Sequence, residues 1–203
     1  ILQNNSQEKV SIVIPVYNES ESLEELYSKI CDAMEKSDYD YNLVFVDDGS
    51  RDGSLEIEEK LVAENDNVTV ASFIANQGKA AALDRGFQVA DGDYVATIDA
   101  DLQDDPYAIP GMIDQIKKSG VDLVSGWKQD RKDKFIKKHT SKIYNFFTRL
   151  ITGIKLHDCN NGLKVYKSKV VKNVIVYGEM HRYIPVLAKQ QGFTCGEIRV
   201  RHF

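Results

Sequence analysis

The chain has 203 residues, 42% hydrophobic and 28% charged, with a formal net charge of −5, which is ordinary for a soluble globular protein with one sizeable core. Three widely spaced cysteines give no disulfide framework and no Cys-x-x-Cys metal pair, and they favour a reducing cytosolic location. No apolar run approaches the roughly 18 to 20 residues that span a bilayer, so we expect these residues not to cross a membrane.

Apolar runs typical of buried strands alternate with stretches of helical periodicity. We expect strands at 10–16, 41–46, 67–74, 94–98 and 121–125 and helices at 53–65, 79–90 and 107–118. A further helix has its apolar face at Leu23, Leu26, Tyr27, Ile30 and Met34, and residues 197–203 resemble part of a strand. This alternation predicts an α/β fold, Rossmann-like, with a mainly parallel sheet and helices on both faces.

Polar clusters follow four of the expected strands: residues 18–19, 47–48, 76–79 and 99–101. In parallel α/β sheets, ligands bind outside the carboxyl ends of the strands. Asp and Asn also favour turns and helix N-caps, so a single cluster would need no functional explanation. Four clusters at one edge favour a shared site.

The stretch TIDADLQDDP gathers four aspartates after a strand. Asp99 and Asp101 are two residues apart, so an extended backbone sends both side chains to the same side, where they suit Mg²⁺ or Mn²⁺ and a diphosphate. Asp104 and Asp105 are expected to start the next helix, with Pro106 in its first turn. An Asp-x-Asp pair alone also occurs in ordinary loops.

Two other clusters allow two interpretations each. Asp47 and Asp48 precede Gly49 and would either form a turn or accept hydrogen bonds from a nucleobase or ribose. The Gly-Lys pair ending at Lys79 would either cap a helix or hold an anion. No GxGxxG or GxxxxGK[ST] motif is present, which removes the main support for dinucleotide-binding and P-loop sites.

A basic segment, residues 128–142, contains seven Lys/Arg and two Asp in an otherwise acidic chain. It predicts a local anionic partner and argues against nucleic acid bound by the whole surface. The apolar helix face that follows, within 143–151, fits either a core helix or an interfacial membrane helix. The four histidines lack zinc-ligand spacing and are expected to be surface or packing residues.

The motifs IVIPVYNESESL, VDDGSRDGS, ANQGKAAALDRGF and DGDYVATIDADLQDDP, in this order, resemble the family 2 glycosyltransferases, which have the GT-A fold. The resemblance covers essentially the whole chain. SGWKQDRKD, HDCNNGLK and GEMHRYIP are similar to the polyprenyl-phosphate branch, which includes dolichol-phosphate mannose synthase and bacterial undecaprenyl-phosphate glucosyltransferases.

The resemblance implies roles for individual residues. The implied nucleotide-binding residues are Pro15, Tyr17, Glu19, Asp47, Asp48, Lys79 and Asp99, the metal ligands are Asp99 and Asp101, and the donor-sugar residue is Gln103. For the acceptor phosphate it implies Lys128, Arg131, Ser141 and Arg182. Asp101 and Asp158 would be the catalytic residues, Asp158 near the reacting centre, unless Asp158 only caps a turn.

The implied activity is metal-assisted, inverting transfer of a sugar from a UDP- or GDP-linked donor to a polyprenyl phosphate, at the cytoplasmic face of a membrane. An ionised lipid phosphate needs no strong general base, but it needs cations beside the anionic donor. One catalytic domain is expected, with a nucleotide-sugar half (1–127) and a C-terminally truncated acceptor half (128–203), possible self-association and no nucleic-acid partner.

Three other functions remain open. An enzyme of the same fold that glycosylates a sugar or protein hydroxyl would need a true general base, and no Glu-Asp pair starts a late helix. A non-catalytic sugar-nucleotide or membrane binding module is disfavoured by the intact Asp99 and Asp101. A sugar-nucleotide pyrophosphorylase would need a glycine-rich N-terminal loop that the chain lacks.

Overall fold

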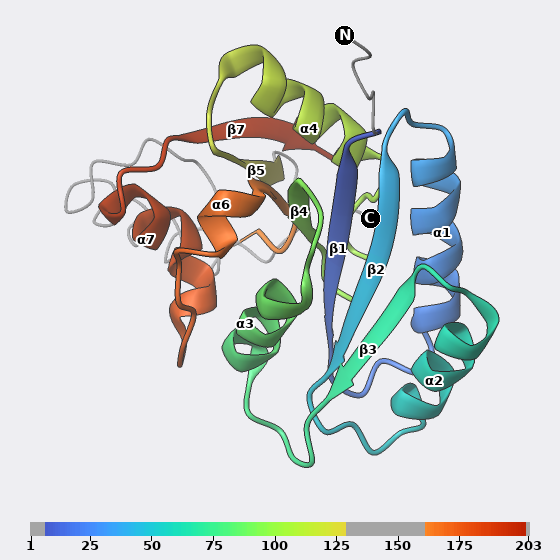
Figure 1. The fold of residues 1–203 in the computed structure, drawn as a ribbon. Coiled ribbons are helices and arrows are strands. Elements are labelled where there is room, and N and C mark those ends of the chain that lie inside the picture. The colour runs from blue at the N-terminus through green and yellow to red at the C-terminus, as the bar shows by residue number, and fades with distance from the viewer. Residues whose placement is uncertain (1–6, 129–160, 202–203) are drawn as a thin grey trace, which may run out of the picture.

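The structure is a computed structural model that describes residues 7–128 and 161–201. Within these residues, seven strands form a sheet in the order β3-β2-β1-β4-β6-β5-β7 (Figure 1). The strands are β1 (Lys9–Val16), β2 (Asp40–Asp47), β3 (Val68–Ser72), β4 (Tyr94–Thr97), β5 (Leu123–Lys128), β6 (Lys164–Lys167) and β7 (Cys195–Val200). Because only β6 runs antiparallel to its neighbours, the expected mainly parallel sheet is confirmed.

Helices cover both faces of the sheet, as expected. They are α1 (Leu23–Glu35), α2 (Ser54–Glu64), α3 (Lys79–Val89), α4 (Ala108–Ser119), α6 (Ser168–Val171), the 3-10 helix η1 (Met180–Tyr183) and α7 (Ile184–Gln190). Figure 1 shows α1 and α2 on one side of the sheet and α3, α6 and α7 on the other. No helix in the described part of the chain is long and apolar enough to span a bilayer.

Each face of the sheet has its own apolar core, and β1 contributes to both. Ile12 belongs to the cluster that includes residues of α1 and α4, whereas its neighbour Val13 belongs to the cluster that includes residues of α3, α6 and α7. Both side chains are fully buried, which explains why this strand reads as a continuous apolar run. A Cβ at Gly86 would lie 2.2 Å from Cγ1 of Val13, so glycine lets α3 approach β1 closely.

The structure differs from the sequence-based expectations in several places. The helices α6, η1 and α7 were not among those expected. The short strand β6 was not expected, and it lies between β4 and β5. Strand β5 begins and ends later than expected and includes Lys128, the first residue of the basic segment. Helix α4 begins at Ala108, and Asp105 accepts the Tyr107 N–H at 3.1 Å just before this start, so the expectation of a place at the helix start is wrong for Asp104. Residues 129–160, including the rest of the basic segment and the expected helix face within 143–151, lie outside the described residues.

The strand register brings the expected site to one edge. Val16 pairs with Asp47 at the ends of β1 and β2, and Val13 pairs with Thr97 at the end of β4. Because these strands are parallel, the chain leaves all three at the same edge of the sheet. The segments after β1, β2 and β4 are therefore neighbours in space.

Candidate active site

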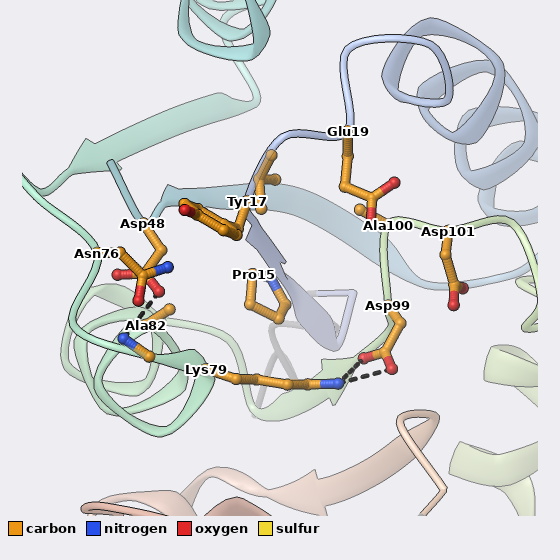
Figure 2. A pocket seen from close by; sticks show the side chains of 12 residues that line it. Pro15, Tyr17, Glu19, Asp48, Asn76, Lys79, Ala82, Asp99, Ala100 and Asp101 are labelled. Carbon is orange, nitrogen blue, oxygen red and sulfur yellow. Dashed lines mark hydrogen bonds and ion pairs between the residues drawn. The ribbon is translucent and has the colours of Figure 1, made fainter. Parts of the chain in front are cut away.

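A cavity of about 350 Å³ lies at this carboxyl edge of the sheet (Figure 2). Segments that follow β1, β2, β3 and β4 all contribute to its wall. The lining residues are Pro15, Val16, Tyr17, Glu19, Asp48, Asn76, Gly78, Lys79, Ala82, Asp99, Ala100 and Asp101. The four polar clusters that follow the strands therefore surround one cavity.

Asp99 is held from two sides. Nζ of Lys79, at the start of α3, lies 2.6 Å from both carboxylate oxygens, as Figure 2 shows. On the other side the backbone of Gly162 is so close that a Cβ there would lie 2.5 Å from Cγ of Asp99. Thr97 anchors this segment by donating its hydroxyl to the Gly162 carbonyl at 2.8 Å. Position 162, two residues before β6, thus has to be a glycine for the carboxylate to keep its place.

The acidic side of the cavity contains Asp101 and Glu19. Asp101 is exposed, and its Oδ1 accepts the backbone N–H of Gln103 at 3.1 Å in a tight turn. Burial raises the pKa of Glu19, and the charges of Asp101, Asp52 and Asp99 raise it further, while a hydrogen bond from Ser22 opposes the shift. A raised carboxyl pKa among like charges indicates negative potential that a cation would relieve.

Asp47 and Asp48 have different surroundings although they are adjacent. The buried Asp47 carboxylate accepts the Gly49 N–H at 3.0 Å, as in the turn interpretation. Asp48 lines the cavity and accepts the N–H groups of Gln77 at 2.6 Å and Gly78 at 2.8 Å. Asp48 therefore fixes the loop that carries Lys79 into the site.

Lys128 and Asp104 form a buried ion pair near the acidic turn. Their N···O distance is 2.7 Å, and their side chains are 7% and 1% exposed. Burial raises the pKa of Asp104, Lys128 lowers it, and Asp99 and Asp101 raise it. Lys128, which the resemblance assigns to the acceptor phosphate, is thus paired with a carboxylate in this structure. The pair also explains why Asp104 is not at a helix start.

The C-terminal half contributes η1, which contacts α3. Arg182 lies on η1, is about half exposed and pairs with Glu179 at 3.6 Å. Its neighbour His181 is partly buried and close enough to Lys79 for the two charges to interact. His181 was expected to be a surface or packing residue, and sequence spacing contained no signal of its proximity to Lys79.

The predicted site residues fall into three groups. Those that line the cavity are Pro15, Tyr17, Glu19, Asp48, Lys79, Asp99 and Asp101, and those that the structure places outside its lining are Asp47, Gln103, Lys128 and Arg182. Arg131, Ser141 and Asp158 lie outside the described residues. Sequence reasoning assigned no role to the lining residues Ala82 and Ala100, whose small side chains leave space but have no polar pattern.

Asp99 and Asp101 offer two carboxylates to a divalent cation in the cavity. Among residues 7–128 and 161–201, no group of three or more His, Cys, Asp or Glu side chains could hold a metal ion. Mg²⁺ or Mn²⁺ nonetheless commonly takes one or two protein carboxylates and completes its shell with phosphate oxygens and water. Asp99 and Asp101 fit that arrangement once a diphosphate is present, with Lys79 as the present counter-ion of Asp99.

Comparisons with known proteins agree with this architecture. The family described as "Glycosyl transferase family 2" matches residues 11–175. The chain is 37% identical over 198 residues to a dodecaprenyl-phosphate galacturonate synthase of Rhizobium johnstonii, covering 96% of this chain and 59% of the relative. It is 37% identical over 200 residues to an undecaprenyl-phosphate 4-deoxy-4-formamido-L-arabinose transferase of Shewanella sediminis, and the match covers 98% of this chain and 60% of the relative. The chain thus spans about 60% of the length of these relatives.

Experimentally solved structures share the fold at low sequence identity. A glucosyl-3-phosphoglycerate synthase of Mycobacterium tuberculosis in complex with UDP superposes with a TM-score of 0.74 at 19% identity, covering 96% of this chain and 70% of that one. A mannosyltransferase of Pyrobaculum calidifontis in complex with GDP-Man and Mn²⁺ superposes with a TM-score of 0.67 at 19% identity, covering 98% of this chain and 57% of that one. With its family match and this shared GT-A architecture, the chain belongs to glycosyltransferase family 2.

Proposed function

We propose that the protein transfers a sugar from a nucleotide-sugar donor to the phosphate of a polyprenyl lipid. The observation that carries the proposal is the cavity that gathers Asp48, Lys79, Asp99 and Asp101 at the carboxyl edge of the sheet. The 37% identical relatives, which are named for transfer to dodecaprenyl and undecaprenyl phosphate, support the acceptor class.

The donor would lie across the cavity from Tyr17 and Asp48 to the acidic turn. Asp48 already accepts two backbone N–H groups, so its main contribution would be to hold the loop that forms the wall. Tyr17 is 49% exposed and offers a ring against which a base would stack. The sugar would then project toward Asp99 and Gln103.

Asp99 and Asp101 would hold Mg²⁺ or Mn²⁺ together with the donor diphosphate, and the cation would offset the negative charge that develops on the leaving diphosphate. Lys79 has two roles in this scheme. Without ligand it neutralises Asp99 at 2.6 Å, and with donor present its ammonium can turn to a phosphate oxygen. A side chain at position 162 would displace the Asp99 carboxylate from this place, which Gly162 leaves free.

The reaction would be an in-line displacement. An oxygen of the lipid phosphate forms a bond to the anomeric carbon, while the bond from that carbon to the diphosphate oxygen breaks and the nucleoside diphosphate leaves with the electron pair. The acceptor phosphate is already ionised, so no side chain has to remove a proton. Attack opposite the leaving group inverts the anomeric configuration. Asp158 would orient the acceptor, with Arg131 and Ser141 among the groups that bind its phosphate.

The acceptor is a membrane lipid, so the site would work at a membrane surface, and we place it at the cytoplasmic face, where nucleotide sugars are available. An acidic protein needs local cations for this contact, and the basic segment at 128–142 would supply them. Self-association of the protein at that surface stays a prediction.

The first test is calorimetric titration of the full-length protein with UDP and with GDP, each with Mn²⁺ and with EDTA. The proposal requires metal-dependent binding of one nucleotide that is lost in Asp101→Asn. If neither nucleotide binds, the donor site is wrong. Transfer from the matching nucleotide sugar to a prenyl phosphate is then measured, and nucleotide binding without any transfer would indicate a non-catalytic binding module.

A further inference from the structure

The positive charges of Lys79, Lys164 and Arg182, from three separate elements, act together on His181, and Lys79 also pairs with Asp99. We call these four residues, Lys79, Lys164, His181 and Arg182, the cationic wall. Lys79 begins α3, Lys164 begins β6, and the other two lie on η1. Lys164 is 4% exposed and donates to the Asn161 carbonyl, next to the glycine that contacts Asp99. In Figure 2 the pale orange ribbon of the C-terminal half passes below Lys79 and Asp99.

His181 is the centre of this wall. Burial lowers the pKa of its imidazole, the charges of Lys79, Arg182 and Lys164 lower it further, and Glu179 opposes them. The ring is therefore neutral at physiological pH. Its Nε2 accepts the Nε–H of Arg182 at 3.4 Å, so the ring proton is on Nδ1.

That proton has no acceptor among the described residues. Nδ1 of His181 is buried and lacks a hydrogen-bond partner there. A buried donor without an acceptor costs free energy comparable to a lost hydrogen bond. Lys79, Lys164 and Arg182 are themselves donors, so they do not satisfy it. The negative charge of Glu179, which acts on His181 from its own segment, is already paired with Arg182.

We propose that the cationic wall binds the phosphate group of the acceptor, with His181 Nδ1 donating a hydrogen bond to a phosphate oxygen. This assignment rests on the proposed transfer to a lipid phosphate, and it adds Lys164 and His181 to the residues considered above. An anion supplies the acceptor that Nδ1–H lacks and is attracted by three cations at once. The donor diphosphate would be balanced separately, by the cation at Asp99 and Asp101.

The wall also explains the position of Lys79 between the two substrates. Its ammonium contacts Asp99 on the donor side, and its charge also acts on His181 on the acceptor side. A phosphate bound at His181 would thus lie next to the donor carboxylates, with one lysine screening the two negative groups from each other. Such screening is what an anionic nucleophile needs to approach an anionic donor.

The test is titration of the full-length protein with farnesyl phosphate, with farnesol as the uncharged probe and UDP with Mn²⁺ as the donor probe. His181→Leu removes the Nδ1 donor, whereas His181→Asn places an amide N–H near the same position. We expect His181→Leu and Arg182→Gln to weaken farnesyl phosphate binding about tenfold or more. His181→Asn should remain within about threefold of the wild type, as should the control Lys118→Met on the distant helix α4.

UDP binding and farnesol binding should not change in any variant, and retained UDP binding shows that each variant is folded. Equal farnesyl phosphate binding by the wild type and His181→Leu would overturn the assignment of the wall. Loss of UDP binding in a variant that unfolds at the same urea concentration as the wild type would assign these residues to the donor diphosphate and also overturn it. If the wild type binds UDP but no farnesyl phosphate, the acceptor class in the proposed function fails as well.

Discussion

Glu58 on α2 provides a pH-dependent test of how the loops of the site are supported. The side chain is 0% exposed, and neither carboxylate oxygen has a hydrogen-bond partner in the described part of the chain. Burial raises its pKa from 4.5 to about 8, with further contributions from Asp47, Asp52 and Glu59. Asp47 and Asp52 accept backbone N–H groups of the loops that follow β1 and β2. Glu58 is therefore protonated at neutral pH, close to the carboxylates that hold these loops.

The sign and size of the effect follow from proton linkage. Between pH 4.5 and 8 the folded protein keeps a proton that the unfolded chain releases, so the free energy of unfolding falls as pH rises through this range. At about 1.36 kcal/mol for each pKa unit, the full loss above pH 8 is about 5 kcal/mol, and about 3 kcal/mol is already lost at pH 7. These are upper limits, because water entry and side-chain relaxation reduce the cost of a buried charge.

Glu58→Gln has the shape of the protonated acid but does not titrate. Urea unfolding at pH 5, 7 and 9 should show that the variant gains stability relative to the wild type as pH rises, by several kcal/mol over this range. A buried amide with an unpaired N–H lowers the free energy of unfolding equally at all three pH values. The informative quantity is therefore the change of this free energy with pH. Glu56→Gln, on the exposed side of the same helix, is the control, and its free energy of unfolding should change with pH as that of the wild type does. If the free energy of unfolding of Glu58→Gln changes with pH as that of the wild type does, the raised pKa of Glu58 is refuted.

Three further substitutions test other parts of the site. Gly162→Ala should weaken Mn²⁺-dependent nucleotide binding at least tenfold with little change in urea stability, because its Cβ would displace the Asp99 carboxylate; wild-type calorimetric affinity would contradict this. Lys128→Met should destabilise the fold by about 3 to 5 kcal/mol, because it leaves the buried Asp104 carboxylate without its partner. The double variant Lys128→Met with Asp104→Leu should be destabilised much less, and equal urea midpoints for the single and double variants would rule out a buried pair. Gly49→Ala should cost at least 1 kcal/mol, because its φ is 73° and the new Cβ would lie 2.7 Å from the Ala75 backbone; an unchanged melting temperature would disprove the clash.

The edge of the sheet that forms the site could be predicted from the alternation of strands and helices along the chain. Parallel strands joined by helices place their carboxyl ends together, whichever neighbours they have, so Tyr17, Asp48 and Asp99 converge. The sequence did not distinguish Asp47 from Asp48. Both follow the same strand, and only the approach of the loop at Gln77 shows which carboxylate faces the cavity.

Contacts between distant segments could not be predicted from local pattern. The four residues of β6 have no clear alternation, and their place between β4 and β5 depends on pairing across the sheet. Asp104 resembled a helix start because carboxylates and a proline precede α4, but a lysine 24 positions later neutralises it. His181 gave no local signal, since its surroundings come from α3 and β6.

The antiparallel strand β6 also affects how this sheet can assemble during synthesis. In the described residues β5 pairs with β6 and β7 but not with β4, so β6 alone joins β4 to the strands β5 and β7. Tyr94 pairs with Lys167, so one edge of β4 stays unpaired until residues some seventy positions later in the chain have been synthesised. During that interval an unpaired strand edge is exposed to other chains, which is the condition under which nascent proteins aggregate. A ribosome pause or a truncation before residue 167 should therefore increase the dependence of this protein on chaperones.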